Sequence, residues 1–144
     1  EADSTFAINA NFERTTDATP FEMPTYSGKK KNFVKYGVLR FNIAGNPQTL
    51  SVYRNLDLAA LPQYRNYLFI PFRDKTSGSD TYGGGRYLDV KTTDVKDGIL
   101  ALDFNKAYNP YCAYSEGYNC PIPPKENLLS IPITAGEKNF AKEH

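Results

Sequence analysis

The chain has 144 residues, of which 23% are charged and 40% hydrophobic, and this size and composition exclude an intrinsically disordered protein. We expect one domain over residues 1–144. The formal net charge is +1 and basic residues are interspersed with acidic ones, which leaves no broad basic face for nucleic acid. No stretch approaches the roughly 18 apolar residues of a membrane span, so we expect no transmembrane segment.

The first part of the chain alternates apolar and polar residues with a period of two, which is typical of half-buried strands. The longest run, residues 33–43, changes phase at Gly37, and a change of phase predicts a β-bulge or a sharp bend. A turn at residues 44–47 then leads into a returning strand, which makes this the clearest predicted hairpin. The strands expected here cover residues 6–12, 21–23, 33–43 and 48–54.

The second part begins with one or two helical turns at residues 57–64, which Pro62 keeps short. We then expect strands at residues 67–72, 86–91, 99–104 and 128–134. Pro132 lies in the last of these, and because proline donates no backbone hydrogen bond this should be an edge strand. Seven to eight short strands with little helix predict an all-β fold, a single antiparallel β-sandwich or barrel.

Several polar residues extend apolar rows at strand ends. Asp74 continues the row of Ile70 and Phe72, and Arg86 shares a row with Leu88. Because an isolated buried charge is costly, these groups need partners. One interpretation is structural, with an Arg86–Asp74 or Arg86–Asp103 ion pair tying loops to the mouth of a barrel. The other is an anionic or polar ligand held by Arg86, whose planar guanidinium suits carboxylates and phosphates.

The second interpretation places a polar pocket where the loop 74–86 meets the segment 103–120. Arg86 would anchor the ligand, Asp74 and Asp103 would orient Arg86, and amide and hydroxyl groups would supply specificity. Arg86→Ala should then abolish binding with little change in fold, whereas unfolding together with lost binding would favour the structural pair. The predicted ligand-binding residues are Asp74, Thr76, Thr81, Arg86, Asp103, Asn105, Tyr108 and Asn109.

Two loop motifs resemble ligand-binding loops only in part. The glycines at positions 83–85 lack the Gly-Lys-Ser or Gly-Lys-Thr of a phosphate loop and precede a predicted strand, so a tight turn explains them better. Residues 74–80 alternate oxygen-bearing side chains as a calcium loop does, but the twelfth position is Gly85 instead of an acidic residue. We expect no cofactor.

The two cysteines, Cys112 and Cys120, favour a disulfide and hence an oxidising compartment, with free structural thiols as the alternative. Zinc would need two further ligands, and the single histidine is His144 at the end of the sequence, so we expect no metal site. A nucleophile with a histidine base cannot be assembled either.

The segments DKTSGSDTYGGGRYLD (residues 74–89), DFNKAYNPYCAYSEGYNCPIPPKENLL (103–129) and AGEK (135–138) closely resemble a bacterial family. It is the domain-of-unknown-function family numbered sixteen eighty-four. The resemblance implies an exported protein or lipoprotein of the bacterial cell envelope, with a lipid anchor upstream of residue 1. It also implies that an N-terminal segment usual in the family is missing here. No catalytic residue is implied.

Three functions therefore stay open. The first is a non-catalytic ligand-binding or accessory protein of the bacterial envelope with a polar pocket around Arg86. The second is a small hydrolase in which Asp103 or Asp74 acts as general base, with Glu126 as a further carboxylate that could pair with Asp74. The third is an assembly module without a small ligand, whose tyrosine-rich loop meets another protein and whose apolar surface lies beside residues 121–124.

Overall fold

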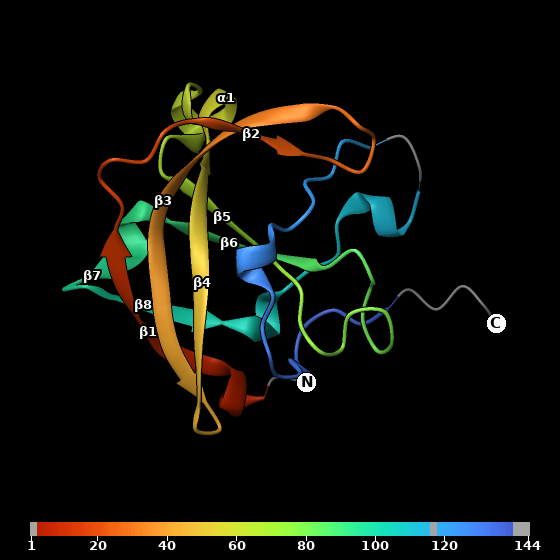
Figure 1. Cartoon of the computed structure of the whole chain (residues 1–144). Helices are drawn as coiled ribbons and strands as arrows, with labels where there is room; N and C mark the ends of the chain where they lie inside the picture. The colour runs from red at the N-terminus through yellow and green to blue at the C-terminus, as the bar shows by residue number, and fades with distance from the viewer. Residues whose placement is uncertain (1–2, 116–117, 140–144) are drawn as a thin grey trace.

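A computed structural model describes residues 3–115 and 118–139. These described residues form eight strands (Figure 1): β1 (Ala7–Arg14), β2 (Phe21–Pro24), β3 (Lys30–Ile43), β4 (Asn46–Asn55), β5 (Tyr67–Phe72), β6 (Arg86–Lys91), β7 (Val95–Lys96) and β8 (Ile99–Asp103). The helices are α1 (Leu56–Ala59) and the single 3-10 turns η1 (Ser4–Phe6), η2 (Pro62–Tyr64), η3 (Thr92–Asp94), η4 (Phe104–Lys106), η5 (Tyr111–Ala113) and η6 (Lys125–Asn127).

All strands belong to one antiparallel sheet in the order β6-β5-β4-β3-β1-β8-β7, with β2 added on β3. The all-β prediction is thus confirmed, and the architecture is one sheet. The ring centroids of Phe72, at the end of β5, and Phe104, just after β8, lie 5.4 Å apart although three strands separate β5 from β8 in the sheet. The sheet therefore curls around one main core (Figure 1).

The predicted irregularity at Gly37 is confirmed, because the register of β3 against β4 shifts between Lys35 and Gly37. A Cβ atom at Gly37 would meet the ring of Phe12 and lie 2.8 Å from the carbonyl oxygen of Glu13, so only glycine fits. The shift reverses which face odd-numbered residues occupy. Leu39 packs in the main core, whereas Phe33 packs in a second cluster.

This second cluster lies on the outer face of the curled sheet. Along β5, Leu68 and Ile70 point into the main core, and Phe69 between them points outward and joins the second cluster. On β6, Tyr87 points outward in the same way, whereas Leu88 points inward. The buried members of the second cluster are Met23, Phe33, Tyr53, Phe69 and Tyr87. The cluster forms the floor on which a candidate site is built.

The strand predicted at residues 128–134 is wrong. Leu128 makes only an isolated parallel bridge to Arg73, and Leu129 donates its amide to the Arg73 carbonyl. Further along, the Ile133 amide donates to a side chain, Asp74 Oδ2. Backbone bonds with Arg73 and Lys75 thus end before Pro132, and beyond it a side chain is the partner. Two smaller differences are that Phe104 lies in η4, beyond the end of β8, and that the two-residue strand β7 was not predicted.

The predicted helical turns at residues 57–64 are confirmed as α1 and η2. The Asn55 side chain caps α1 by accepting from the amides of Asp57 and Leu58. Over the described ranges, no helix is long and apolar enough to cross a membrane.

Candidate functional site

Arg86 and Asp74 form a buried ion pair on the inner side of the sheet. Arg86 is 1% exposed, and its Nη2 lies 2.9 Å from Asp74 Oδ2. The guanidinium also donates to three backbone carbonyls of the segment that follows η6: Nη2 to Ile133 and Nη1 to Ala135 and Glu137. Burial lowers the pKa of Arg86 from its ordinary value, and the charge of Asp74 opposes that shift.

Asp74 has no oxygen left over. Its Oδ2 accepts from Arg86 and from the Ile133 amide, and its Oδ1 accepts from the amide and the hydroxyl of Thr76. The Thr76 hydroxyl in turn lies 2.9 Å from that of Thr81. All four side chains are buried, and together they tie the loop between β5 and β6 to the C-terminal segment. The structural Arg86–Asp74 pair is therefore present, and a ligand-anchoring role for Arg86 stays a prediction.

Asp103 and Asn105 lie elsewhere. The Asp103 carboxylate caps η4 by accepting from the amide and the side chain of Asn105, and Asn105 also bonds to the backbone of Asp3. Asp103 lines a small cavity of about 340 Å³, whose other lining residues belong to the paired strands β1 and β8 and to η4. It forms no ion pair with Arg86 in the described part of the chain. A general-base role for Asp74 or Asp103 stays a prediction.

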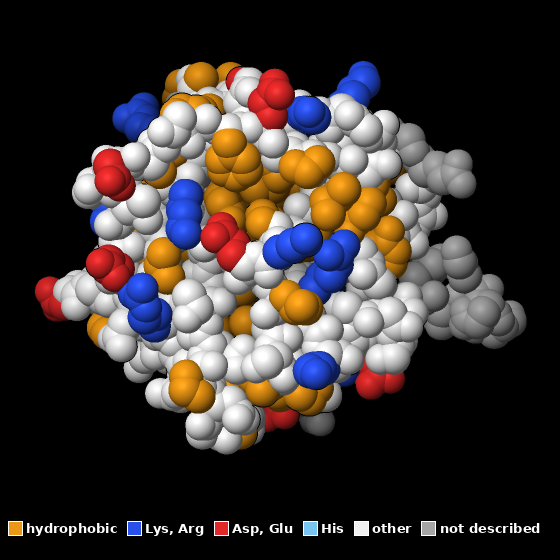
Figure 2. Space-filling view, in the orientation of Figure 1, with side chains coloured by type: hydrophobic (Ala, Val, Ile, Leu, Met, Phe, Trp, Pro, Cys, Tyr) orange, Lys and Arg blue, Asp and Glu red, His pale blue; other side chains and the backbone are white. Residues whose placement is uncertain are grey.

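A larger cavity of about 670 Å³ lies over the second cluster, on the outer face of the sheet. Its walls come from β3, the end of β4, α1, β5, β6 and the segment after η4. Six of the lining residues are tyrosines. Hydrophobic side chains gather on the face that β2 and this last segment border (Figure 2). The lining residues are Lys31, Phe33, Asn55, Leu58, Tyr67, Phe69, Tyr87, Asp89, Tyr108, Asn109, Pro110, Tyr111, Tyr114, Tyr118, Asn119, Cys120, Pro121 and Glu137.

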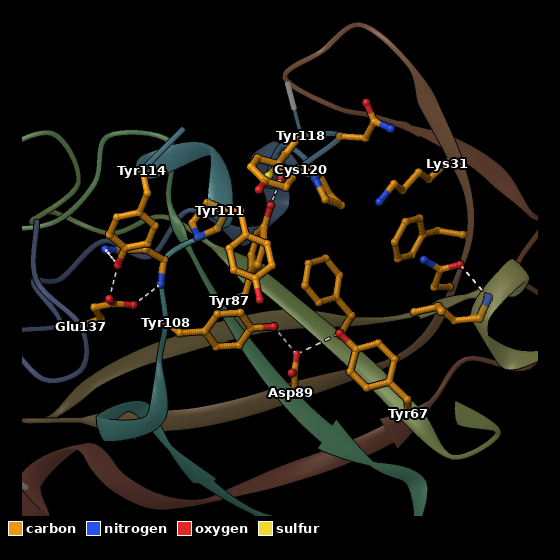
Figure 3. Close-up of a pocket in the computed structure, with 18 residues that line it drawn as sticks. Lys31, Tyr67, Tyr87, Asp89, Tyr108, Tyr111, Tyr114, Tyr118, Cys120 and Glu137 are labelled. Atoms are coloured by element: carbon orange, nitrogen blue, oxygen red, sulfur yellow. Dashed lines mark hydrogen bonds between the residues drawn. The ribbon is translucent and has the colours of Figure 1, made fainter. Parts of the chain in front are cut away.

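One side of this cavity is built around Asp89. The hydroxyls of Tyr67 and Tyr108 both donate to its Oδ1, at 2.9 and 2.7 Å, and Figure 3 shows the two rings flanking the carboxylate. Burial, and then the neighbouring Asp89, raises the pKa of both tyrosines. The two phenols therefore stay neutral at physiological pH, and each has its hydrogen directed at Asp89.

Glu137 fixes a second side. It accepts from the Asn109 amide at 2.7 Å and from the Tyr114 hydroxyl (Figure 3). The Asn109 side-chain amide donates to the Tyr114 hydroxyl and to the Lys138 carbonyl. Asn109 is 5% exposed, and its Oδ1 has no hydrogen-bond partner among the described residues. An unmet buried acceptor is unusual and needs an explanation.

The third side is the loop closed by the predicted disulfide, which is confirmed between Cys112 and Cys120. This loop is fastened at its end, because the Tyr87 hydroxyl donates to the Pro121 carbonyl at 2.6 Å and the Tyr26 amide donates to the Cys120 carbonyl at 3.0 Å. The rings of Tyr111 and Tyr118 face each other at 5.4 Å. The disulfide is consistent with a location outside the cytoplasm.

The eight predicted ligand-binding residues thus lie in three different places in the structure. Tyr108 and Asn109 line the larger cavity, whereas the other six belong to the buried Arg86 cluster or to the η4 cap. The residues that the prediction missed, including Tyr67, Tyr87 and Asp89, alternate with inward-facing residues on β5 and β6. One signal was available: residues 67–72 are apolar on both faces, which indicates that the outer face is covered as well.

No group of three or more His, Cys, Asp or Glu side chains that could hold a metal occurs within residues 3–115 and 118–139. His144 lies outside the described residues. The cavity offers aromatic faces, hydroxyls, amides, two carboxylates and one ammonium.

The family model described as "Protein of unknown function (DUF1684)" matches residues 1–138. Among solved structures, the chain is similar to the solution NMR structure of an uncharacterized protein of Haloarcula marismortui. The two share 32% sequence identity with a TM-score of 0.78, over 99% of this chain and 76% of that one. No curated protein matches. The chain belongs to the DUF1684 family of proteins of unknown function.

Proposed function

We propose that this protein binds a small, ring-bearing molecule in the tyrosine-lined cavity. The observation that carries the proposal is the cavity itself, about 670 Å³ with six tyrosines around it. That volume lies in the range of small-molecule sites, and tyrosine supplies flat apolar contact area together with a polar tip.

In this proposal the Arg86 cluster positions the site. Arg86 holds the carbonyls of Ala135 and Glu137, and the Glu137 carboxylate holds the Asn109 amide. Arg86 also precedes Tyr87, which lines the cavity. Loss of Arg86 would therefore disturb the wall through Glu137, and no anion needs to reach the guanidinium.

We further propose that the protein works outside the cytoplasm, in the bacterial cell envelope or secreted. The disulfide supports this placement, because the bond closes one wall of the cavity and persists in oxidising compartments. In such a place the protein would act as a binding or accessory protein.

The test is a titration of the isotope-labelled protein with a library of small aromatic and saccharide fragments, followed by amide NMR shifts. We expect shifts at residues 108, 109 and 111 and at residues 118–120. Tyr111→Ala should weaken them, since Tyr111 lines the cavity and, at 70% exposed, is not needed for the fold. Leu128→Ala is the matched control, because Leu128 is 62% exposed and lies outside the cavity. Shifts confined to other surfaces would contradict the proposal.

A second candidate is a protein partner that meets the disulfide loop. Tyr111 and Tyr118 are 70% and 47% exposed, and exposed aromatic residues are frequent anchors of protein interfaces. Binding of a partner without any fragment bound in the cavity, and loss of that binding in Tyr111→Ala, would favour this candidate.

A further inference from the structure

The Asp89 side of the cavity presents hydrogen-bond acceptors and no donors. A phenol has one hydroxyl hydrogen, and Tyr67 and Tyr108 both donate theirs to Asp89 Oδ1. Their oxygens keep only lone pairs for a third partner. Asp89 Oδ2 receives no hydrogen bond from the residues that the structure describes. A molecule that meets this wall must therefore bring its own hydrogens.

Asn109 is a residue of the same lining, but its unpaired oxygen is closed off from solvent. Asn109 Oδ1 is buried and unpaired, while the Nδ2 of the same side chain is held by the Tyr114 hydroxyl and the Lys138 carbonyl. The Lys138 carbonyl can only accept, so the amide cannot be turned to offer Nδ2 to the cavity without losing that bond. Asn109 therefore offers the cavity no hydrogen-bond donor.

The charges that face the cavity are two carboxylates, Asp89 and Glu137, against one ammonium, Lys31. Tyrosine faces add negative electrostatic potential, which attracts cations. Tyr87 packs edge to face against Tyr108, with ring centroids 5.7 Å apart. This contact fixes the orientation of Tyr108, one of the two rings that flank Asp89. Both acceptors and charges thus favour a positive group.

Resting on the binding function proposed above, we propose that the ligand of this cavity is an organic amine. Its protonated nitrogen lies against Asp89 between Tyr67 and Tyr108, and its ring lies among the tyrosines. The pKa values of Tyr67 and Tyr108, raised by burial and by Asp89, support this arrangement because they keep both phenols neutral and their hydrogens on Asp89.

Lys31 is the rival feature. It lies on β3 across the cavity from Tyr108 (Figure 3) and forms no ion pair in the described ranges. A ligand carboxylate would pair with it. Asp89 is itself exposed, but its Oδ1 is held by two hydrogen bonds, whereas Lys31 is a partly exposed ammonium on a long flexible side chain. The fixed group should dominate selectivity.

The test compares three probes with the same phenol ring and different charge: tyramine (positive), tyrosol (neutral) and 4-hydroxyphenylacetate (negative). Affinities come from NMR shift titration of the whole protein at neutral pH. We expect tyramine to bind about tenfold or more tightly than tyrosol, since a charge-assisted hydrogen bond is about twice as strong as a neutral one. The anion should bind most weakly.

Asp89→Asn should remove the tyramine advantage and leave tyrosol within about twofold, because the side-chain oxygen still accepts from both tyrosines. Glu13→Gln is the matched control: Glu13 is an exposed carboxylate paired with Arg40, outside the cavity. Equal binding of tyramine and tyrosol, or tighter binding of 4-hydroxyphenylacetate, would overturn the amine proposal and leave the binding function intact. If none of the three probes shifts the cavity residues, the amine proposal fails, and the fragment titration decides the binding function separately.

Discussion

Replacing Arg86 by methionine should destabilise the protein severely. Met keeps the apolar stem of the side chain and removes the guanidinium, which leaves the Asp74 carboxylate buried without its cation. It also deprives the carbonyls of Ile133, Ala135 and Glu137 of their donor. Breaking a buried pair from one side costs about 3–5 kcal/mol, a large part of the roughly 5–15 kcal/mol that stabilises a domain. For about 150 residues this lowers Tm by roughly 6–20 °C.

The assay is urea unfolding followed by circular dichroism, with Arg40→Met as the control. The Arg40–Glu13 pair has nearly the same geometry, 2.7 Å against 2.9 Å, but both of its side chains are more than half exposed. We expect the control to lose less than about 1 kcal/mol. An Arg86→Met variant as stable as Arg40→Met would refute the structural role of the buried pair. If that variant also lost binding, Arg86 would be the ligand anchor.

Three further predictions concern other parts of the fold. Cys112→Ser with Cys120→Ser should lose about 2.5 kcal/mol of unfolding free energy and weaken fragment binding, because the loop walls the cavity; unchanged binding would contradict this role. Gly37→Ala should cost about 1–3 kcal/mol through its clash with Phe12, and a neutral effect in the same unfolding assay would show that β3 yields there. The free energy of unfolding should fall above pH 10, because burial raises the pKa of Tyr53, Tyr67, Tyr87 and Tyr108 above the ordinary 10.0. Above pH 10 the unfolded chain binds fewer protons than the folded one, so rising pH favours unfolding. A free energy of unfolding that stays constant to about pH 11 would contradict this prediction.

The strands could be predicted because alternation of apolar residues is a local property of the sequence. The phase change at Gly37 even predicted the register shift, since a bulge must reverse the faces on either side of it. Residues 128–134 show the limit of this reasoning. Their pattern is that of a strand. Besides the backbone bonds with Arg73 and Lys75, however, Ile133 bonds to the side chains of Asp74 and Arg86, and alternation says nothing about such partners.

Strand phase predicted a partner for Arg86, either Asp74 or Asp103, because charges at inward-facing positions need partners, and in the structure it is Asp74. The cavity did not follow. Its floor comes from the outward-facing residues of β5 and β6, which an ordinary sheet would expose to solvent, and its cover comes from the disulfide loop more than 20 residues later in the chain. Which loop covers an outer face is decided by long-range contacts such as the one from Tyr87 to Pro121.

The most direct test of this account is a crystal structure of the protein with tyramine. We predict the phenol ring among the cavity tyrosines and the nitrogen within about 3 Å of Asp89 Oδ2, with Arg86 still bound to Asp74. Tyramine bound with its nitrogen in solvent, or held at Arg86 with the outer cavity empty, would contradict the account.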